Sequence, residues 1–132
     1  MDTWAWDPGE NVQVYCNGSG YGDLCFLETN DSQAQAVSIH QNVPLGPLQG
    51  HSYQLCMQLR VGGTTPATVQ LVVWLRGGTI PQQSAQQTTT LTSSSWQPLC
   101  TFAYTQVSGH TQLYGQLIMQ TSNVNVDVDQ VT

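Results

Sequence analysis

The stretch Val69-Gln70-Leu71-Val72-Val73-Trp74-Leu75-Arg76 decides the fold class of this 132-residue chain. Its odd-numbered positions are all aliphatic, and its even-numbered positions carry a tryptophan, two polar side chains and one valine. A period of two residues is typical of a β-strand that turns one face to a hydrophobic core and the other face away from it. The same alternation recurs at residues 53–60, 112–119 and 124–129. We therefore expect these four segments to be strands.

The rest of the chain has less regular strand patterns that are separated by turn residues, and no segment predicts an amphipathic helix. We expect further strands at residues 11–16, 24–28, 36–41 and 96–105, and a polar loop at 82–95 with a short strand at 88–91. We expect turns at residues 44–47, 62–63, 77–78 and 108–109. About eight strands in 132 residues, without an internal repeat, predict one all-β domain over residues 1–132, a sandwich or a barrel.

The composition limits the partners of the chain. Only 8% of the residues are charged, the net charge is −6, and Arg60 and Arg76 are the only cationic side chains besides histidine. Nucleic-acid binding requires clustered basic residues, so we expect a ligand that is neutral or only lightly charged. The chain has no transmembrane span, and Met1-Asp2-Thr3-Trp4 lacks the features of a signal peptide. We expect the domain to be part of a larger secreted or cell-surface protein.

Four cysteines and the absence of a Cys-x-x-Cys pair favour disulfides over a zinc site. Three pairings are possible. We favour Cys16–Cys25, because the turn-rich residues 17–22 between them let the chain fold back, and this leaves Cys56–Cys100. Each bond would add about 3–4 kcal/mol of stability. The alternative is four buried thiols. Disulfides predict an extracellular location.

The outward residues of the three most regular strands point to a binding function. If those strands lie in one sheet, one face collects several glutamines, two aromatic residues and both arginines. Glutamine amides both donate and accept hydrogen bonds, as paired sugar hydroxyls require, and aromatic rings pack against the C–H face of a pyranose. The candidate ligand-binding residues are Gln54, Gln58, Arg60, Gln70, Trp74, Arg76, Gln112, Tyr114 and Gln116. In the alternative reading each glutamine only solvates the surface, and Trp74 is covered by a second layer or a loop.

Several stretches resemble the jelly-roll carbohydrate-binding modules of families four, nine, sixteen and twenty-two. The first is an aromatic strand start after a glycine turn, at residues 50–56, and the second is a tryptophan before an apolar, hydroxyl-containing strand, at 96–102. The third is a final valine-rich strand with an acidic residue before its last valine, at 126–131. The resemblance implies a two-sheet antiparallel β-sandwich, galactose-binding-domain-like, with a concave face that binds a glycan without catalysis.

The resemblance also implies one structural calcium ion, with Asp129 as a ligand. The chain departs from the family pattern here, because the usual Asn-x-Gly-Phe-Glu opening is missing before Trp4. Calcium needs six or more oxygen ligands.

Catalytic patterns are absent from the sequence. A glycosidase needs two carboxylates about 5–10 Å apart, and no acidic pair falls on a face with the aromatic residues. His40, His51 and His110 lack metal-ligand spacing, and no serine lies in a Gly-x-Ser-x-Gly elbow. We therefore expect no enzyme. The main alternative function is a structural or adhesive extracellular β-domain that forms a surface layer or a self-assembled fibre through exposed strand edges.

Overall fold

The computed structural model describes residues 4–8, 10–22, 25–31, 38–43, 50–102, 104–105 and 109–132. Some expected positions lie outside the described residues: the turn at 44–47, residue 108 of the turn at 108–109, residue 24 of the strand at 24–28, residues 36–37 of the strand at 36–41, and residue 103 of the strand at 96–105. The strands are β1 (Ala5–Trp6), β2 (Glu10–Cys16), β3 (Cys25–Asp31), β4 (Ser38–Val43), β5 (Ser52–Tyr53), β6 (Cys56–Val61), β7 (Ala67–Arg76), β8 (Gln83–Leu91), β9 (Gln97–Cys100), β10 (Tyr104–Thr105), β11 (Gln112–Met119) and β12 (Val126–Asp129).

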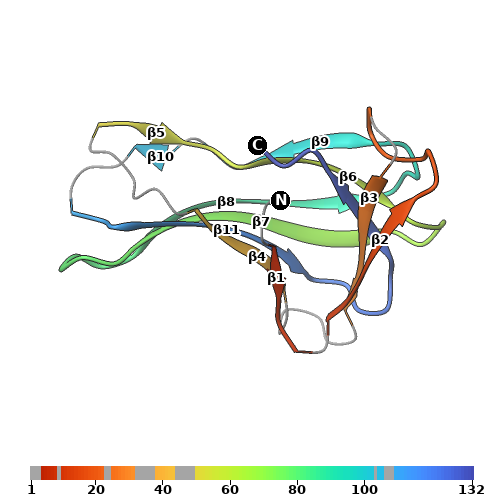
Figure 1. Ribbon diagram of the computed structural model, residues 1–132, viewed down its shortest axis with the longest axis horizontal. Helices are drawn as coiled ribbons and strands as arrows, with labels where there is room; N and C mark the ends of the chain where they lie inside the picture. Colours follow the sequence, from red (N-terminus) through yellow and green to blue (C-terminus); the bar gives the residue numbers. More distant parts are fainter. Residues whose placement is uncertain are drawn as a thin grey trace.

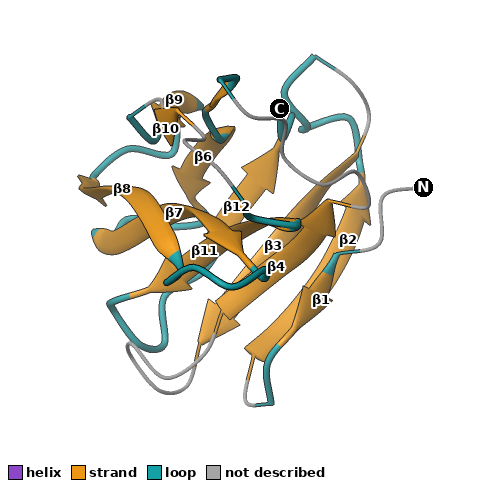
Figure 2. Ribbon diagram, turned by 90° about the vertical axis from the view of Figure 1, so that its left-hand side faces the viewer, coloured by secondary structure: helices purple, strands orange, loops and turns teal. Residues whose placement is uncertain are grey.

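Ten of these strands form two five-stranded antiparallel sheets. Sheet A has the order β1-β4-β11-β7-β8, and sheet B has the order β2-β3-β12-β6-β9. Figure 1 shows β6 and β9 in one layer above β7, β8 and β11 in the other, and Figure 2 shows the two strand orders from one end. The expectation of a two-sheet β-sandwich is confirmed. No helix in the described part of the chain could cross a bilayer.

The hydrophobic core lies between the two sheets and is built by the predicted alternation. Along β7 the aliphatic residues at odd-numbered positions are buried, with Leu71 and Leu75 both 0% exposed. Leu117 of β11 packs in the same cluster, and sheet B contributes Leu59 of β6 and Val126 of β12. Since each strand sends every second side chain into this layer, the remaining side chains of both sheets point outward.

One expectation about the strands was wrong. The segments at 53–60, 69–76 and 112–119 do not share one sheet, because β6 pairs with β12 and β9 in sheet B, while β7 and β11 pair in sheet A. The outward side chains of β6 therefore lie on the opposite side of the molecule from those of β7. A two-residue period predicts which face of a strand is buried, but it carries no information about which strands pair.

A second correction concerns residues 82–95, which we expected to include a loop before a short strand at 88–91. Here β8 runs from Gln83 to Leu91 and pairs with β7 along its whole length. Its residues are polar on both faces except at Ala85 and Leu91. An edge strand with such a composition lacks the apolar alternation that predicts a strand, so the sequence pattern missed most of it.

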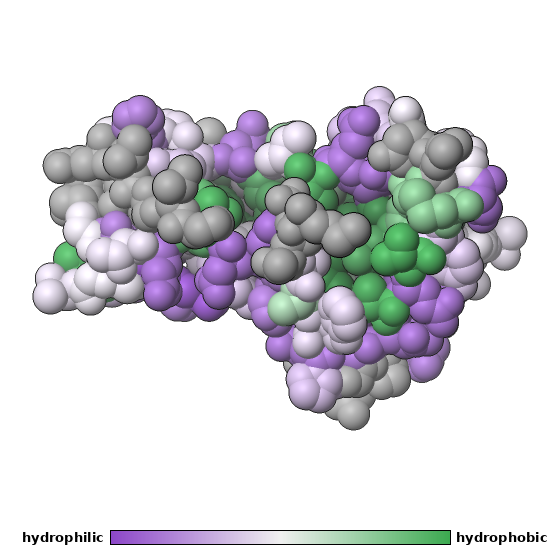
Figure 3. Space-filling model, in the orientation of Figure 1, coloured by the Kyte–Doolittle hydropathy of each residue, from purple (hydrophilic) through white to green (hydrophobic). Residues whose placement is uncertain are grey.

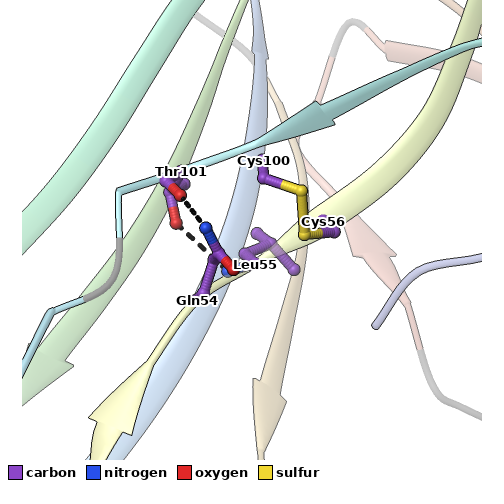
Figure 4. Close-up of a disulfide and its surroundings, with 5 residues drawn as sticks. All are labelled: Gln54, Leu55, Cys56, Cys100 and Thr101. Carbon is purple, nitrogen blue, oxygen red and sulfur yellow. Dashed lines mark hydrogen bonds between the residues drawn. A yellow bond between two sulfur atoms is a disulfide. The ribbon is translucent and has the colours of Figure 1, made fainter.

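Both favoured disulfides are confirmed: Cys16 is bonded to Cys25, and Cys56 is bonded to Cys100. The second bond joins β6 to β9 at directly paired positions. Figure 4 shows the backbone N–H of Leu55 donating to Thr101 Oγ1 at 3.1 Å beside this bond. The disulfide and this hydrogen bond together hold the edge strand β9 on sheet B.

Candidate functional site

The outward face of sheet A brings together most of the predicted binding residues. Strand register places Trp74 of β7 directly opposite Tyr114 of β11, and Val72 opposite Gln116. The face also carries uncharged polar residues from β8 and β4, which the sequence analysis did not select. We define the sheet A face as Ser38, His40 and Asn42 of β4, Gln70, Val72, Trp74 and Arg76 of β7, Ser84, Gln86, Thr88 and Thr90 of β8, and Gln112, Tyr114, Gln116 and Ile118 of β11.

A chain of hydrogen bonds crosses this face. The indole Nε1 of Trp74 donates to Gln116 Oε1 at 2.9 Å, and Gln116 Nε2 donates to Ser38 Oγ at 2.8 Å. Ser38 Oγ in turn donates to Asp7 Oδ2 at 2.9 Å. Because both ends of the Gln116 amide have protein partners, its orientation is determined. One N–H and one oxygen lone pair of the amide remain for a ligand.

Aromatic and cationic groups stack along the same face. The rings of Tyr114 and His40 are stacked with centroids 5.3 Å apart. The guanidinium carbon of Arg76 lies 4.3 Å from the ring centroid of Tyr114 and 4.9 Å from that of Trp74. Trp74 is partly exposed, so its indole is not sealed beneath other protein atoms. These contacts hold the aromatic side chains of the face in defined positions.

The outward side chains of sheet A cover Val72, an apolar residue of the same face. Val72 points away from the core, yet only 1% of it is exposed. The outward side chains around it therefore pack over it. Covering Val72 removes its apolar surface from water, which stabilises the packed arrangement of the outward side chains.

The electrostatics keep the Tyr114 hydroxyl protonated. Burial raises the pKa of Tyr114 above its ordinary value of 10.0, and the Asp7 carboxylate raises it further. The charge of Arg76 and a hydrogen bond to Arg76 act in the opposite direction but do not outweigh burial. The phenol is therefore neutral at ordinary pH and can donate one hydrogen bond.

The shape of the molecule provides an open recess beside this face. Figure 3, in the orientation of Figure 1, shows the surface hollowed below the layer that contains β7, β8 and β11, where a lobe that includes β1 projects downward. Hydrophilic residues line the hollow. Two cavities, of about 160 and 190 Å³, are lined by residues outside the sheet A face. A ligand of the sheet A face would lie on the side of the layer where Figure 3 shows this hollow.

Three of the predicted binding residues do not reach this face. Gln54, just before β6, donates from Nε2 to the carbonyl oxygen of Thr101 at 2.7 Å. Gln58 and Arg60 point outward from sheet B, where Arg60 Nε donates to Asp127 Oδ2 at 2.7 Å. Their separation from Trp74 follows from the placement of β6 in sheet B.

The sequence analysis missed Ser38 and Asp7 and treated His40 only as a non-ligand histidine. The sequence carries only a weak sign that Ser38 and His40 share an outward face. Ile39 between them is the one buried apolar residue of the alternation at this point of the described chain. Pairing of β4 with β11 and of β1 with β4 brings them to the face.

Both carboxylate oxygens of Asp129, the predicted calcium ligand, accept backbone hydrogen bonds. Asp129 Oδ2 accepts the backbone N–H of Tyr21 at 2.6 Å, and Oδ1 accepts that of Gln130 at 2.7 Å. Within the described ranges no three acidic, histidine or cysteine side chains converge as metal ligands. Calcium requires six or more oxygen ligands, and the calcium ion at Asp129 stays a prediction.

No family model and no curated protein matches this sequence. Solved structures do match. A xylanase 10B chain of Clostridium thermocellum, with its family 22 module and catalytic module complexed with xylohexaose, gives a TM-score of 0.78 at 14% identity, over 97% of this chain and 25% of that chain. The first family 22 xylan-binding domain of Paenibacillus barcinonensis xylanase 10C gives 0.76 at 16% identity, over 97% and 82%. A family 16 carbohydrate-binding module gives 0.67 at 13% identity, over 98% and 88%.

These matches confirm the resemblance at the level of the fold. The chain spans about a quarter of the xylanase chain but more than four fifths of the separate family 22 domain. A structure of a family four module matches as well. The protein therefore has the two-sheet jelly-roll fold of the family 22 carbohydrate-binding modules.

Proposed function

We propose that this chain is a noncatalytic module that binds a polysaccharide along the sheet A face, with a xylan backbone as the first candidate. The observation that carries the proposal is the pairing of a partly exposed Trp74 with an oriented Gln116 amide. A ring stacks on the C–H face of one sugar, and the amide addresses the hydroxyls of a sugar beside it.

The matched structures support the choice of xylan as the first ligand. One was solved as a complex with xylohexaose, and another is described as a xylan-binding domain. Each neutral hydrogen bond contributes about 0.5–1.5 kcal/mol. Two stacked rings and a few such bonds correspond to dissociation constants of roughly micromolar to millimolar. That affinity suffices when the module is tethered beside a polymer.

We also propose that the module belongs to a larger extracellular protein. Two disulfides favour an oxidising compartment. In the matched Clostridium thermocellum xylanase, the module is joined to a catalytic module of a glycoside hydrolase family.

Affinity electrophoresis in gels with dissolved xylan tests the binding function. We expect the unaltered protein to be retarded in xylan, and Trp74→Ala to migrate as it does without polysaccharide. Phe102→Ala is the matched control, because Phe102 is 71% exposed and lies outside the sheet A face. Migration of the unaltered protein that no polysaccharide changes, together with concentration-dependent oligomers, would contradict glycan binding and favour a self-assembling structural domain.

A further inference from the structure

The two arginines of the chain occupy closely similar aromatic surroundings. The guanidinium carbon of Arg60 lies 4.9 Å from the ring centroid of Phe26 and 4.3 Å from that of Trp96. For Arg76 the distances are 4.9 Å to Trp74 and 4.3 Å to Tyr114. In both cases the guanidinium carbon lies over two rings, and a guanidinium makes its hydrogen bonds in its own plane, at its edge.

The two arginines differ in the hydrogen-bond partners of their guanidinium groups. Arg60 Nε donates to Asp127 Oδ2 at 2.7 Å, and Asp127 is only 2% exposed. No carboxylate of the described residues lies within ion-pair distance of Arg76. Its Nε is buried and has no hydrogen-bond partner in the described part of the chain. Arg76 shares a hydrogen bond with Tyr114, but no described carboxylate balances its charge. The partly exposed remainder of its guanidinium is therefore open to an acidic acceptor.

Asp7, an acidic residue beside the sheet A face, already has partners at the other end of the face. Asp7 accepts the hydroxyl of Ser38 and lies 3.9 Å from Nδ1 of His40, at the β1 edge of the sheet. Arg76 ends β7 on the far side of β11 from these residues. The acid at one end of the face therefore has partners among its own side chains, and the cation at the other end has no carboxylate partner among the described residues.

We propose that the glycan bound by the sheet A face carries a carboxylate, as a uronic acid residue, and that Arg76 pairs with this carboxylate. The inference rests on the proposed function. A planar guanidinium edge matches a carboxylate in two parallel hydrogen bonds. Because Arg76 stacks on Trp74, an acidic branch beside a sugar on that ring is within reach of it.

The net charge of −6 does not oppose this pairing. Screening at physiological salt limits charge–charge effects between exposed groups to about 8 Å. Acids farther than this from Arg76 act weakly on an anion there, so the local contact decides. The composition also predicts a ligand that is at most lightly charged, which an occasional uronic acid on a neutral backbone satisfies.

Comparing three ligands distinguishes the effect of the branch's charge on affinity from the effect of its shape. They are neutral xylohexaose, a xylo-oligosaccharide of the same length with one glucuronic acid branch, and the carboxyl-reduced form of that branched ligand. Isothermal titration calorimetry of the unaltered protein should show the acidic ligand binding about tenfold or more tightly than its reduced form. Arg76→Gln should abolish this ratio, whatever the change in its affinity for the neutral ligand, because the ratio compares two ligands on the same variant. Arg76→Lys should give an intermediate ratio, since it keeps the charge without the planar edge.

The outcomes distinguish this inference from the proposed function. Equal affinity for the acidic and reduced ligands, with neutral xylohexaose bound, would overturn the role of Arg76 and leave glycan binding intact. An undiminished preference for the acidic ligand in Arg76→Gln would do the same. Failure of the unaltered protein to bind any of the three would overturn both.

Discussion

Trp74 and Gln116 are 42 residues apart in the sequence and are joined by a hydrogen bond of 2.9 Å from the indole Nε1 to Oε1 of the amide. The bond links neighbouring strands β7 and β11 on the outward side of sheet A. Through Gln116 Nε2 it continues to the buried hydroxyl of Ser38. The aromatic platform and the amide are therefore arranged before any ligand arrives, and preorganisation lowers the cost of binding.

Replacing Gln116 by Leu removes both of its hydrogen bonds. The indole N–H of Trp74 and the hydroxyl of Ser38 each lose a partner, so we expect the free energy of unfolding to fall by about 1–3 kcal/mol. Urea unfolding followed by tryptophan fluorescence measures this. Gln70→Leu is the control, since Gln70 lies on the same face outside this chain of bonds; an equal loss in both variants would contradict the role of the Gln116 amide.

Replacing Trp74 by Phe keeps an aromatic ring but removes the N–H donor. We expect xylan binding to weaken less than in Trp74→Ala, because the stacking surface persists while Gln116 loses its orientation. A ratio of about tenfold between the two variants in dissociation constant is expected from the stacking contribution. Calorimetric titration with xylohexaose checks the order; tighter binding by Trp74→Ala than by Trp74→Phe would refute it.

Loss of the Cys56–Cys100 bond should destabilise the fold more than loss of the Cys16–Cys25 bond. The two bonds close loops of sequence separation 44 and 9. The chain-entropy model gives about 4 kcal/mol for the longer loop and about 3 kcal/mol for the shorter one. The paired serine variants, compared by denaturant unfolding, test the order. The reverse order would show that native contacts, not loop closure, determine the difference.

Glu28 of β3, which is paired with Asp127 of β12 on the outward face of sheet B, makes stability depend on pH. Burial raises the pKa of Glu28 above its ordinary 4.5, a hydrogen bond from Asn125 lowers it, and the neighbouring Asp127 charge raises it. Between pH 4.5 and the raised value the folded state binds more protons than the unfolded state. The contribution of Glu28 to stability is therefore present below pH 4.5 and is lost as pH rises through the folded pKa.

Glu28→Gln should remove this loss. We expect the free energy of unfolding of the variant, minus that of the unaltered protein, to increase as pH rises above 4.5 and then to level off. Urea unfolding at several pH values from about 4, near the ordinary carboxylate pKa values, to about 8 measures this difference. A difference that stays constant with pH would contradict the raised pKa.

The turn after β7 requires glycine. Gly78 has φ of +75°, and a Cβ there would lie 1.9 Å from the carbonyl oxygen of Gly109. Gly18 has φ of +80° with nothing within 4 Å of its Cβ position. We expect Gly78→Ala to destabilise the fold by about 1–3 kcal/mol more than Gly18→Ala, because only the first adds a backbone clash to the conformational cost. Thermal unfolding of the two variants compares them; similar effects would mean that the loops move apart at little cost.

The sequence by itself determined the strands with regular alternation and their buried sides. Along β7 and β11 every residue predicted to face outward does so, including Trp74, Tyr114 and Gln116. The disulfide pairing also followed from the sequence, because residues 17–22 favour a short closed loop and leave one remaining pair. These are local properties: a two-residue period and a turn-rich segment act over a few residues.

Only the tertiary structure decided which outward residues meet. The placement of β6 in sheet B moved Arg60 to Asp127 on the opposite side, and the pairing of β4 with β11 brought Ser38 to Gln116. The polar strand β8 pairs with β7 in sheet A although its sequence has no apolar alternation. Alternation records on which side of a strand water is excluded, and it is the same whichever sheet the strand joins. Strand pairing depends on backbone hydrogen bonds and core packing between distant segments, which no local pattern contains.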